Sequence, residues 1–66
     1  MEKRKLFHDT KFKSYEDLVN FCLCVFGFGC EVDRDNHTIS ISNVQGEWTL
    51  FKTKVNFGGW YLEEIV

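Results

Sequence analysis

Hydrophobic and polar positions follow two different patterns along this 66-residue chain. From Leu18 to Phe26 every position except Asn20 is apolar, which is typical of a helix that is covered on most sides. After Gly29, hydrophobic and polar residues alternate and turn-forming residues interrupt them, which is typical of strands. The pattern therefore predicts one helix followed by several short strands.

The residues that flank the apolar run define the ends of the helix. Ser14 and Asp17 have the spacing of a capping box, and Glu16 adds a second negative charge to the first turn. Gly27 tolerates the positive φ that commonly ends a helix. We therefore expect a helix from about Tyr15 to Phe26.

The alternating region predicts an antiparallel meander. Strands are expected at Glu31–Arg34, His37–Ser42, Glu47–Val55 and Trp60–Ile65, and a weaker first strand at Leu6–His8. Helix and strands together predict an α+β fold of two layers, with one helix packed on a three- to five-stranded antiparallel meander sheet. Residues 1–66 form a single small domain in this interpretation, with residues 1–5 as a basic arm that frays. The order of the strands does not follow from the sequence.

The last turn of the predicted helix carries apolar residues at positions that are expected to face water. Glu16 and Asn20 mark the stripe that faces water, and the same stripe continues to Leu23 and Cys24. We expect Leu23, Cys24 and the following Phe28 to contact another chain unless the sheet covers them.

A second candidate contact surface lies on the predicted sheet. Trp48 and Leu50 share one face of the longest strand with Lys52, and the lysine-bearing face is expected to point outward. Trp48, Leu50 and Tyr61 would then form an exposed aromatic patch, and such patches mark partner sites. The alternative is a bulge near Gly46 that turns Trp48 into the core.

The composition shows which residues can build the core, and the charged residues are unevenly distributed along the chain. Aromatic residues make up 17% of the chain, so a core of large rings is available to a domain too small for an extensive one. Residues 1–13 carry five basic and two acidic side chains (+3), and residues 14–66 carry three basic and eight acidic ones (−5). A basic segment on an acidic body either steers an anionic partner or simply keeps the surface soluble.

The three cysteines predict free thiols. Cys22 and Cys24 would lie on opposite sides of the helix and so cannot share a metal ion, and Cys30 follows on the sheet. We expect no metal and no cofactor. An odd cysteine count without a signal peptide favours a reducing, cytoplasmic setting, and the apolar run is far shorter than the ~20 residues of a membrane span.

Motifs that would carry catalysis are incomplete. Asp33-Arg34-Asp35 resembles the start of a calcium loop, but Thr38 and Val44 stand where glycine and glutamate are needed. The glycine-rich stretch lacks the rest of a nucleotide fingerprint, and no nucleophile, base and orienting acid can be assigned. The sequence predicts no catalytic residues and no enzyme.

These observations favour a small, non-catalytic module that binds another protein or a second copy of itself. Its candidate contacts are Leu23, Cys24, Phe28, Trp48, Leu50, Lys52 and Tyr61. Size and composition, with neither alanine nor proline in the chain, fit an inhibitor of a host enzyme encoded by a phage or mobile element, and a homodimer is the simpler form of the same hypothesis. The alternative is a single-stranded nucleic-acid-binding protein that stacks bases on Trp48 and Tyr61 beside Lys52. The acidic body counts against it.

Overall fold

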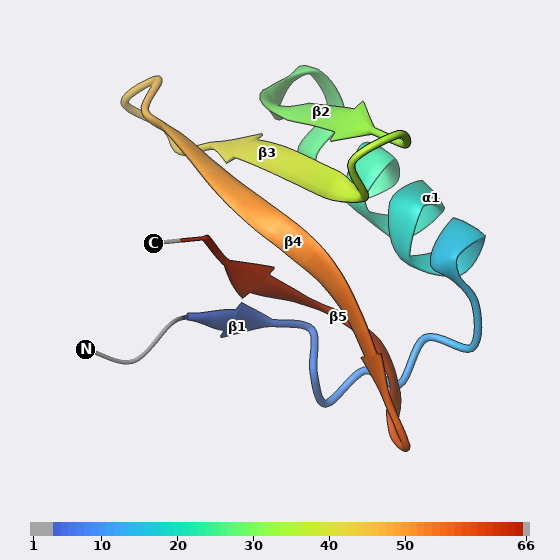
Figure 1. Ribbon diagram of the computed structural model, residues 1–66. Coiled ribbons are helices and arrows are strands. Elements are labelled where there is room, and N and C mark those ends of the chain that lie inside the picture. The colour runs from blue at the N-terminus through green and yellow to red at the C-terminus, as the bar shows by residue number, and fades with distance from the viewer. Residues whose placement is uncertain (1–3, 66) are drawn as a thin grey trace.

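The computed structural model describes residues 4–65, which form one helix packed on one face of a five-stranded antiparallel sheet (Figure 1). Helix α1 (Tyr15–Phe26) continues into a 3₁₀ turn, η1 (Gly27–Gly29). The strands are β1 (Lys5–Leu6), β2 (Cys30–Asp33), β3 (Thr38–Ser42), β4 (Trp48–Asn56) and β5 (Gly59–Glu64). Their order is β1-β5-β4-β3-β2, so β2 to β5 form a meander and β1 is added beside β5. The predicted α+β fold of two layers is confirmed.

Local capping explains where α1 begins and ends. The Ser14 hydroxyl accepts a hydrogen bond from the Asp17 N–H at 3.1 Å, which satisfies one of the free amides of the first turn. At the other end Gly27 has φ 54°, and its N–H donates to the Leu23 carbonyl. The helix therefore spans the residues that the sequence predicts.

The core lies between α1 and the inner face of the sheet. Its buried apolar residues are Leu18, Val19 and Cys22 from α1 and Cys30, Ile39, Phe51 and Leu62 from the strands. The pairing of Ile39 with Phe51, and of Thr53 with Leu62, places these four side chains on the helix side. Thr53 is buried but satisfied, because its hydroxyl donates to the His37 carbonyl at 2.9 Å.

Strand β4 pairs residue for residue with β3, from Ser42 opposite Trp48 to Thr38 opposite Lys52. An unbroken register keeps alternate residues on opposite faces. Trp48 therefore lies on the face away from α1, and the alternative in which a bulge turns it into the core is wrong.

The first strand differs from its prediction. It covers Lys5–Leu6 instead of Leu6–His8, because Phe7 adopts φ 64° and leaves the sheet. The Phe7 ring packs instead against Phe21, at 5.1 Å between centroids, in a cluster of aromatic rings beside α1. The tertiary contacts of one side chain thus end the strand.

Part of the predicted basic arm is tied to the sheet. Lys5 lies in β1, and the Arg4 guanidinium donates to both carboxylate oxygens of Glu64, at 3.1 and 3.3 Å. The Glu64 N–H in turn donates to the Arg4 carbonyl at 2.8 Å. Arg4 and Lys5 are thus bonded to β5 in the structure, and residues 1–3 of the predicted arm lie outside the described part of the chain.

A candidate protein-binding surface

The face of the sheet opposite α1, called here the outer face, carries its side chains in rows across the strands. From Trp48 to Lys54 of β4 four rows follow one another: Ser42–Trp48, then Glu31–Ser40–Leu50, then Asp33–Thr38–Lys52–Glu63–Lys5, then Lys54–Tyr61. Asn56, opposite Gly59, lies beyond the last of them. The rows follow from strand pairing alone, since directly paired residues point to the same side.

Three adjacent apolar side chains form the outer patch, which we define as Trp48, Leu50 and Ile65. Ile65 joins it because its N–H donates to the Leu50 carbonyl at 3.0 Å, which extends the second row beyond β4. Their exposed fractions are 50%, 42% and 45%, high values for side chains of this kind on a sheet face. Ile65 is not among the contacts predicted from the sequence, although it shares the odd-numbered alternation of Tyr61 and Glu63.

Tyr61 is on the outer face but does not belong to this patch. It pairs with Lys54, two rows away from Leu50, and the row of Lys52 and Glu63 lies between them. The expectation of one continuous patch of Trp48, Leu50 and Tyr61 is therefore wrong. The error arises from register, which the alternation of residue types does not contain.

Two of the three lysines of the outer face, Lys5 and Lys52, stand beside a carboxylate, and the third, Lys54, pairs with Tyr61. Lys52 pairs directly with Glu63, and Glu63 pairs on its other side with Lys5. The Lys52 ammonium also donates to the Asn36 carbonyl at 2.9 Å, which holds it toward the turn between β2 and β3. Glu63 thus stands between the two lysines of this charged row.

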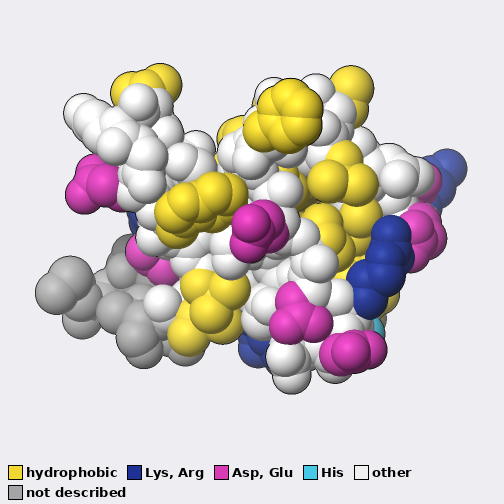
Figure 2. Space-filling view, turned by 90° about the horizontal axis from the view of Figure 1, so that it is seen from above, with side chains coloured by type: hydrophobic (Ala, Val, Ile, Leu, Met, Phe, Trp, Pro, Cys, Tyr) yellow, Lys and Arg dark blue, Asp and Glu magenta, His cyan; other side chains and the backbone are white. Residues whose placement is uncertain are grey.

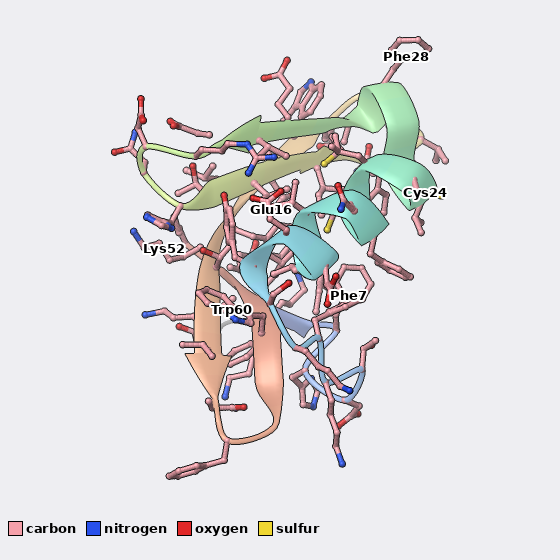
Figure 3. The ribbon with its side chains drawn as sticks, turned by 90° about the vertical axis from the view of Figure 1, so that its right-hand side faces the viewer. Phe7, Glu16, Cys24, Phe28, Lys52 and Trp60 are labelled. Carbon is pink, nitrogen blue, oxygen red and sulfur yellow. The ribbon has the colours of Figure 1, made fainter. Side chains whose placement is uncertain are left out.

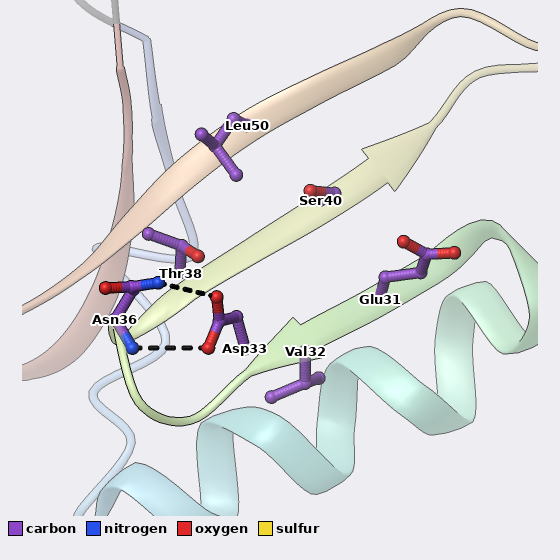
Figure 4. Close-up of a pocket in the computed structure, with 7 residues that line it drawn as sticks. All are labelled: Glu31, Val32, Asp33, Asn36, Thr38, Ser40 and Leu50. Carbon is purple, nitrogen blue, oxygen red and sulfur yellow. Dashed lines mark hydrogen bonds between the residues drawn. The ribbon is translucent and has the colours of Figure 1, made fainter.

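A hollow of about 410 Å³ adjoins the outer patch and shares Leu50 with it (Figure 4). Its lining consists of Glu31, Val32, Asp33, Asn36, Thr38, Ser40 and Leu50. The Asp33 carboxylate is already engaged, because it accepts from the Asn36 side-chain amide at 2.8 Å and from the N–H groups of Asp35 and Asn36. These bonds, chiefly those from Asn36, hold the pKa of Asp33 below its usual value. The hollow therefore presents a stable negative charge beside an apolar wall.

The helix end is a separate surface. Leu23 is 44% exposed, Cys24 is exposed, and Phe28 in η1 is fully exposed. Figure 3 shows Cys24 on the helix side of the sheet, Lys52 on the opposite side, and Phe28 above both. The structure thus groups Trp48, Leu50 and Lys52 on one face and leaves the predicted contacts of the helix end on another.

Other exposed apolar side chains are scattered. Val44 and Phe57 are fully exposed in the two turns that flank β4. Viewed from above, the molecule shows hydrophobic side chains in several groups with acidic side chains between them (Figure 2). The outer patch differs from these because its three members are neighbours on one face of the sheet.

The cysteines take the positions that helical geometry predicts. Cys22 is buried and Cys24 is exposed, so the two thiols lie on different sides of α1. Burial, with a smaller contribution from the neighbouring Cys30, raises the pKa of the Cys22 thiol to about 12. Within residues 4–65 no group of three or more His, Cys, Asp or Glu side chains is placed to hold a metal ion.

The two histidines, His8 and His37, lie apart from the outer patch. The His8 ring approaches the Asp9 carboxylate at 3.4 Å, and both side chains are largely exposed. The His37 ring packs edge-on against Tyr15, with 5.5 Å between centroids. Each histidine thus has a local contact that accounts for its position.

No helix in the described part of the chain is long and apolar enough to cross a membrane. Comparisons with protein families, with curated proteins and with solved structures give no match to this chain.

Proposed function

We propose that this protein is a non-catalytic module that binds another protein chain through its outer patch. The observation that carries the proposal is the cluster of Trp48, Leu50 and Ile65, which lie side by side on a sheet face that no described element covers. Aromatic and large aliphatic side chains at the centre of a surface, with a polar surround, are the usual hot spots of protein interfaces. Here the surround consists of the serines of β3 and the charged row.

Nucleic-acid binding has less support. A single-strand binder needs free cations along the strand path and aromatic rings close enough to stack successive bases. On this face Lys52 and Lys5 both neighbour Glu63, and Trp48 and Tyr61 are separated by the charged row. Glu31 and Asp33 would also repel phosphates from the β2 side of the face.

In one form of this proposal, the protein is encoded by a phage or mobile element and binds and inhibits a host enzyme. The small size and unusual composition of the chain motivate it. Isolation of the protein from its native host tests this form, because an inhibitor is recovered with its enzyme. Recovery without any enzyme would rule that form out.

The proposed contact is tested with surface variants in a capture experiment. Trp48→Ala and Leu50→Lys should abolish capture of the partner at any salt concentration, because they remove apolar contact area, and should leave the circular dichroism spectrum unchanged. Phe57→Ser is the matched control, since Phe57 is fully exposed in the turn at the other end of β4. Undiminished capture by Trp48→Ala and Leu50→Lys would refute the proposal.

A further inference from the structure

We infer that the chain bound at the outer patch is a second copy of this protein, packed sheet on sheet around a twofold axis that runs along β4. The inference rests on the proposed function and names its partner. It follows from the place of β4 in the sheet and from the order of charges across the outer face.

Strand β4 is the middle strand of five, and it carries Trp48 and Leu50 on the outer face. A twofold axis along this strand, in the plane between two copies, lays each β4 over its counterpart. The two outer patches then cover one another, as an isologous contact requires. Stacked sheets keep their strands within about 30° of each other, so the rows near the axis stay opposite their counterparts.

The same axis reverses the order of every row in the second copy. The row that contains Lys52 and Glu63 therefore faces its own reverse, and its two ends carry opposite charges. The row reads Asp33, Thr38, Lys52, Glu63, Lys5 from the β2 edge to the β1 edge. Reversal places Asp33 of one copy opposite Lys5 of the other, on both sides of the axis. Lys52 meets its own counterpart, but a Glu63 flanks each of these two lysines on the neighbouring strand. Lys54 also meets its own counterpart, since it lies on the same strand. Like charges therefore meet only along the middle strand, and opposite charges face one another at both edges of the contact.

Other arrangements of two copies fit less well. A twofold axis across the strands would bring the Glu31 and Asp33 edge onto itself and Trp48 toward Lys54. Pairing of two β2 edges would set the same carboxylates side by side, a feature that protects edge strands from pairing. Strand β1, the other edge, has only two residues.

The size of the face indicates a dimer that dissociates on dilution. The rows from Trp48 to Lys54 hold about 13 side chains, and with about 4.8 Å between strands and about 6.8 Å between rows they cover roughly 400 Å² per copy. Two such faces bury roughly 800 Å², the size of a weak, transient contact. A small domain with a thin core gains stability from such an association.

Sedimentation equilibrium over a concentration series tests the inference on the whole chain. The wild type should pass from monomer to dimer, and Leu50→Lys should raise the dissociation constant about 100-fold, because it buries a charge at the centre of the contact. Phe57→Ser should dimerise as the wild type does. A wild type that stays monomeric, or a dimer that Leu50→Lys does not weaken, would overturn the inference.

Charge reversal tests the direction of the axis. Lys5→Glu and Asp33→Lys should each weaken self-association about tenfold, because each sets like charges at both contacting edges. The circular dichroism spectrum of each variant is compared with that of the wild type, since Asp33 also accepts hydrogen bonds in the turn after β2. An equimolar mixture of the two variants should associate more tightly than either alone, since every edge contact between unlike copies again joins opposite charges. A mixture no tighter than its components would overturn this geometry.

The outcomes also separate this inference from the proposed function. If the wild type is monomeric and Trp48→Ala still abolishes capture of a different protein, the second copy is wrong and protein binding through the outer patch stands. If the wild type is monomeric and capture is unaffected, both fail.

Discussion

At the scale of single residues, Leu50 joins the main features of the outer face. It lies beside Ile65 in the outer patch, forms a wall of the acidic hollow, and is separated from Tyr61 by the charged row. An apolar side chain in that position gains little from the protein's own fold, because its inward neighbour Phe51 already fills the core. Its contribution is therefore expected in binding, which is why Leu50→Lys separates binding from folding.

The reactivity of the thiols tests which side of α1 is buried against the sheet and which side is exposed. Cys24 should react with an alkylating reagent at pH 7.5 in the folded protein, whereas Cys22 and Cys30 should react only after unfolding, because they are buried. The raised pKa of Cys22 acts in the same direction, since burial keeps that thiol protonated. Mass spectrometry of timed samples counts the modified sites.

Equal labelling of all three cysteines in folded protein would contradict the packing of α1. Labelling is best done well below pH 9. Near and above that pH the Cys22 thiol ionises in the unfolded chain but stays protonated in the folded protein, where its pKa is raised, and this difference favours unfolding. Above that pH the folded state loses stability and Cys22 becomes accessible through unfolding.

At the scale of elements, local signals predicted more than long-range ones. Ser14 and Gly27 define α1 to the residue, because both act within one helical turn. The four strands after α1 fall within about one residue of their predictions, since turn residues limit them. The end of β1 at Phe7 was not predictable, because its backbone follows from an aromatic cluster drawn from distant parts of the chain.

The outer patch was predicted in part for the same reason. Alternation along β4 placed Trp48 and Leu50 on the face of Lys52, which the structure bears out in position. Which residue of β5 lies beside Leu50 depends on the length of the turn at Phe57 and on the pairing that results. That register adds Ile65 and separates Tyr61, and residue types alone do not contain it.

Gly59 joins two elements and gives a prediction at this scale. It has φ 122°, and a Cβ there would lie 2.5 Å from the Phe12 carbonyl oxygen. Gly59→Ala should lower the free energy of unfolding by about 2–4 kcal/mol, because strain and a backbone clash both oppose the contact of β5 with the segment before α1. Urea titration followed by circular dichroism measures the loss.

Gly46→Ala is the matched control for this substitution. Gly46 also has a positive φ, 85°, but a Cβ there meets nothing within 4 Å. The control should lose about 1 kcal/mol, from backbone strain alone. Equal losses in the two variants would mean that the approach of Phe12 to Gly59 contributes nothing to stability.

At the scale of the whole molecule, charge and apolar area are arranged around the same strand. Acidic side chains lie at the β2 edge of the outer face, Lys5 at the β1 edge, and the outer patch beside the middle of the sheet. The net charge of −2 conceals this arrangement. Each copy has two layers, the helix and the sheet. Two copies packed outer face to outer face would form a particle of four layers, with the two sheets inside and the two helices outside.

Trp48 reports directly on the central claim, that the outer face is where this protein makes its contact. In a Trp60→Phe variant the fluorescence comes from Trp48 alone, whose side chain is half exposed in the isolated protein. We predict that its emission shifts to shorter wavelength as protein concentration rises, and that adding Leu50→Lys abolishes the shift. Emission that stays at the wavelength of a solvent-exposed tryptophan at every concentration would contradict the packing of one outer face on another.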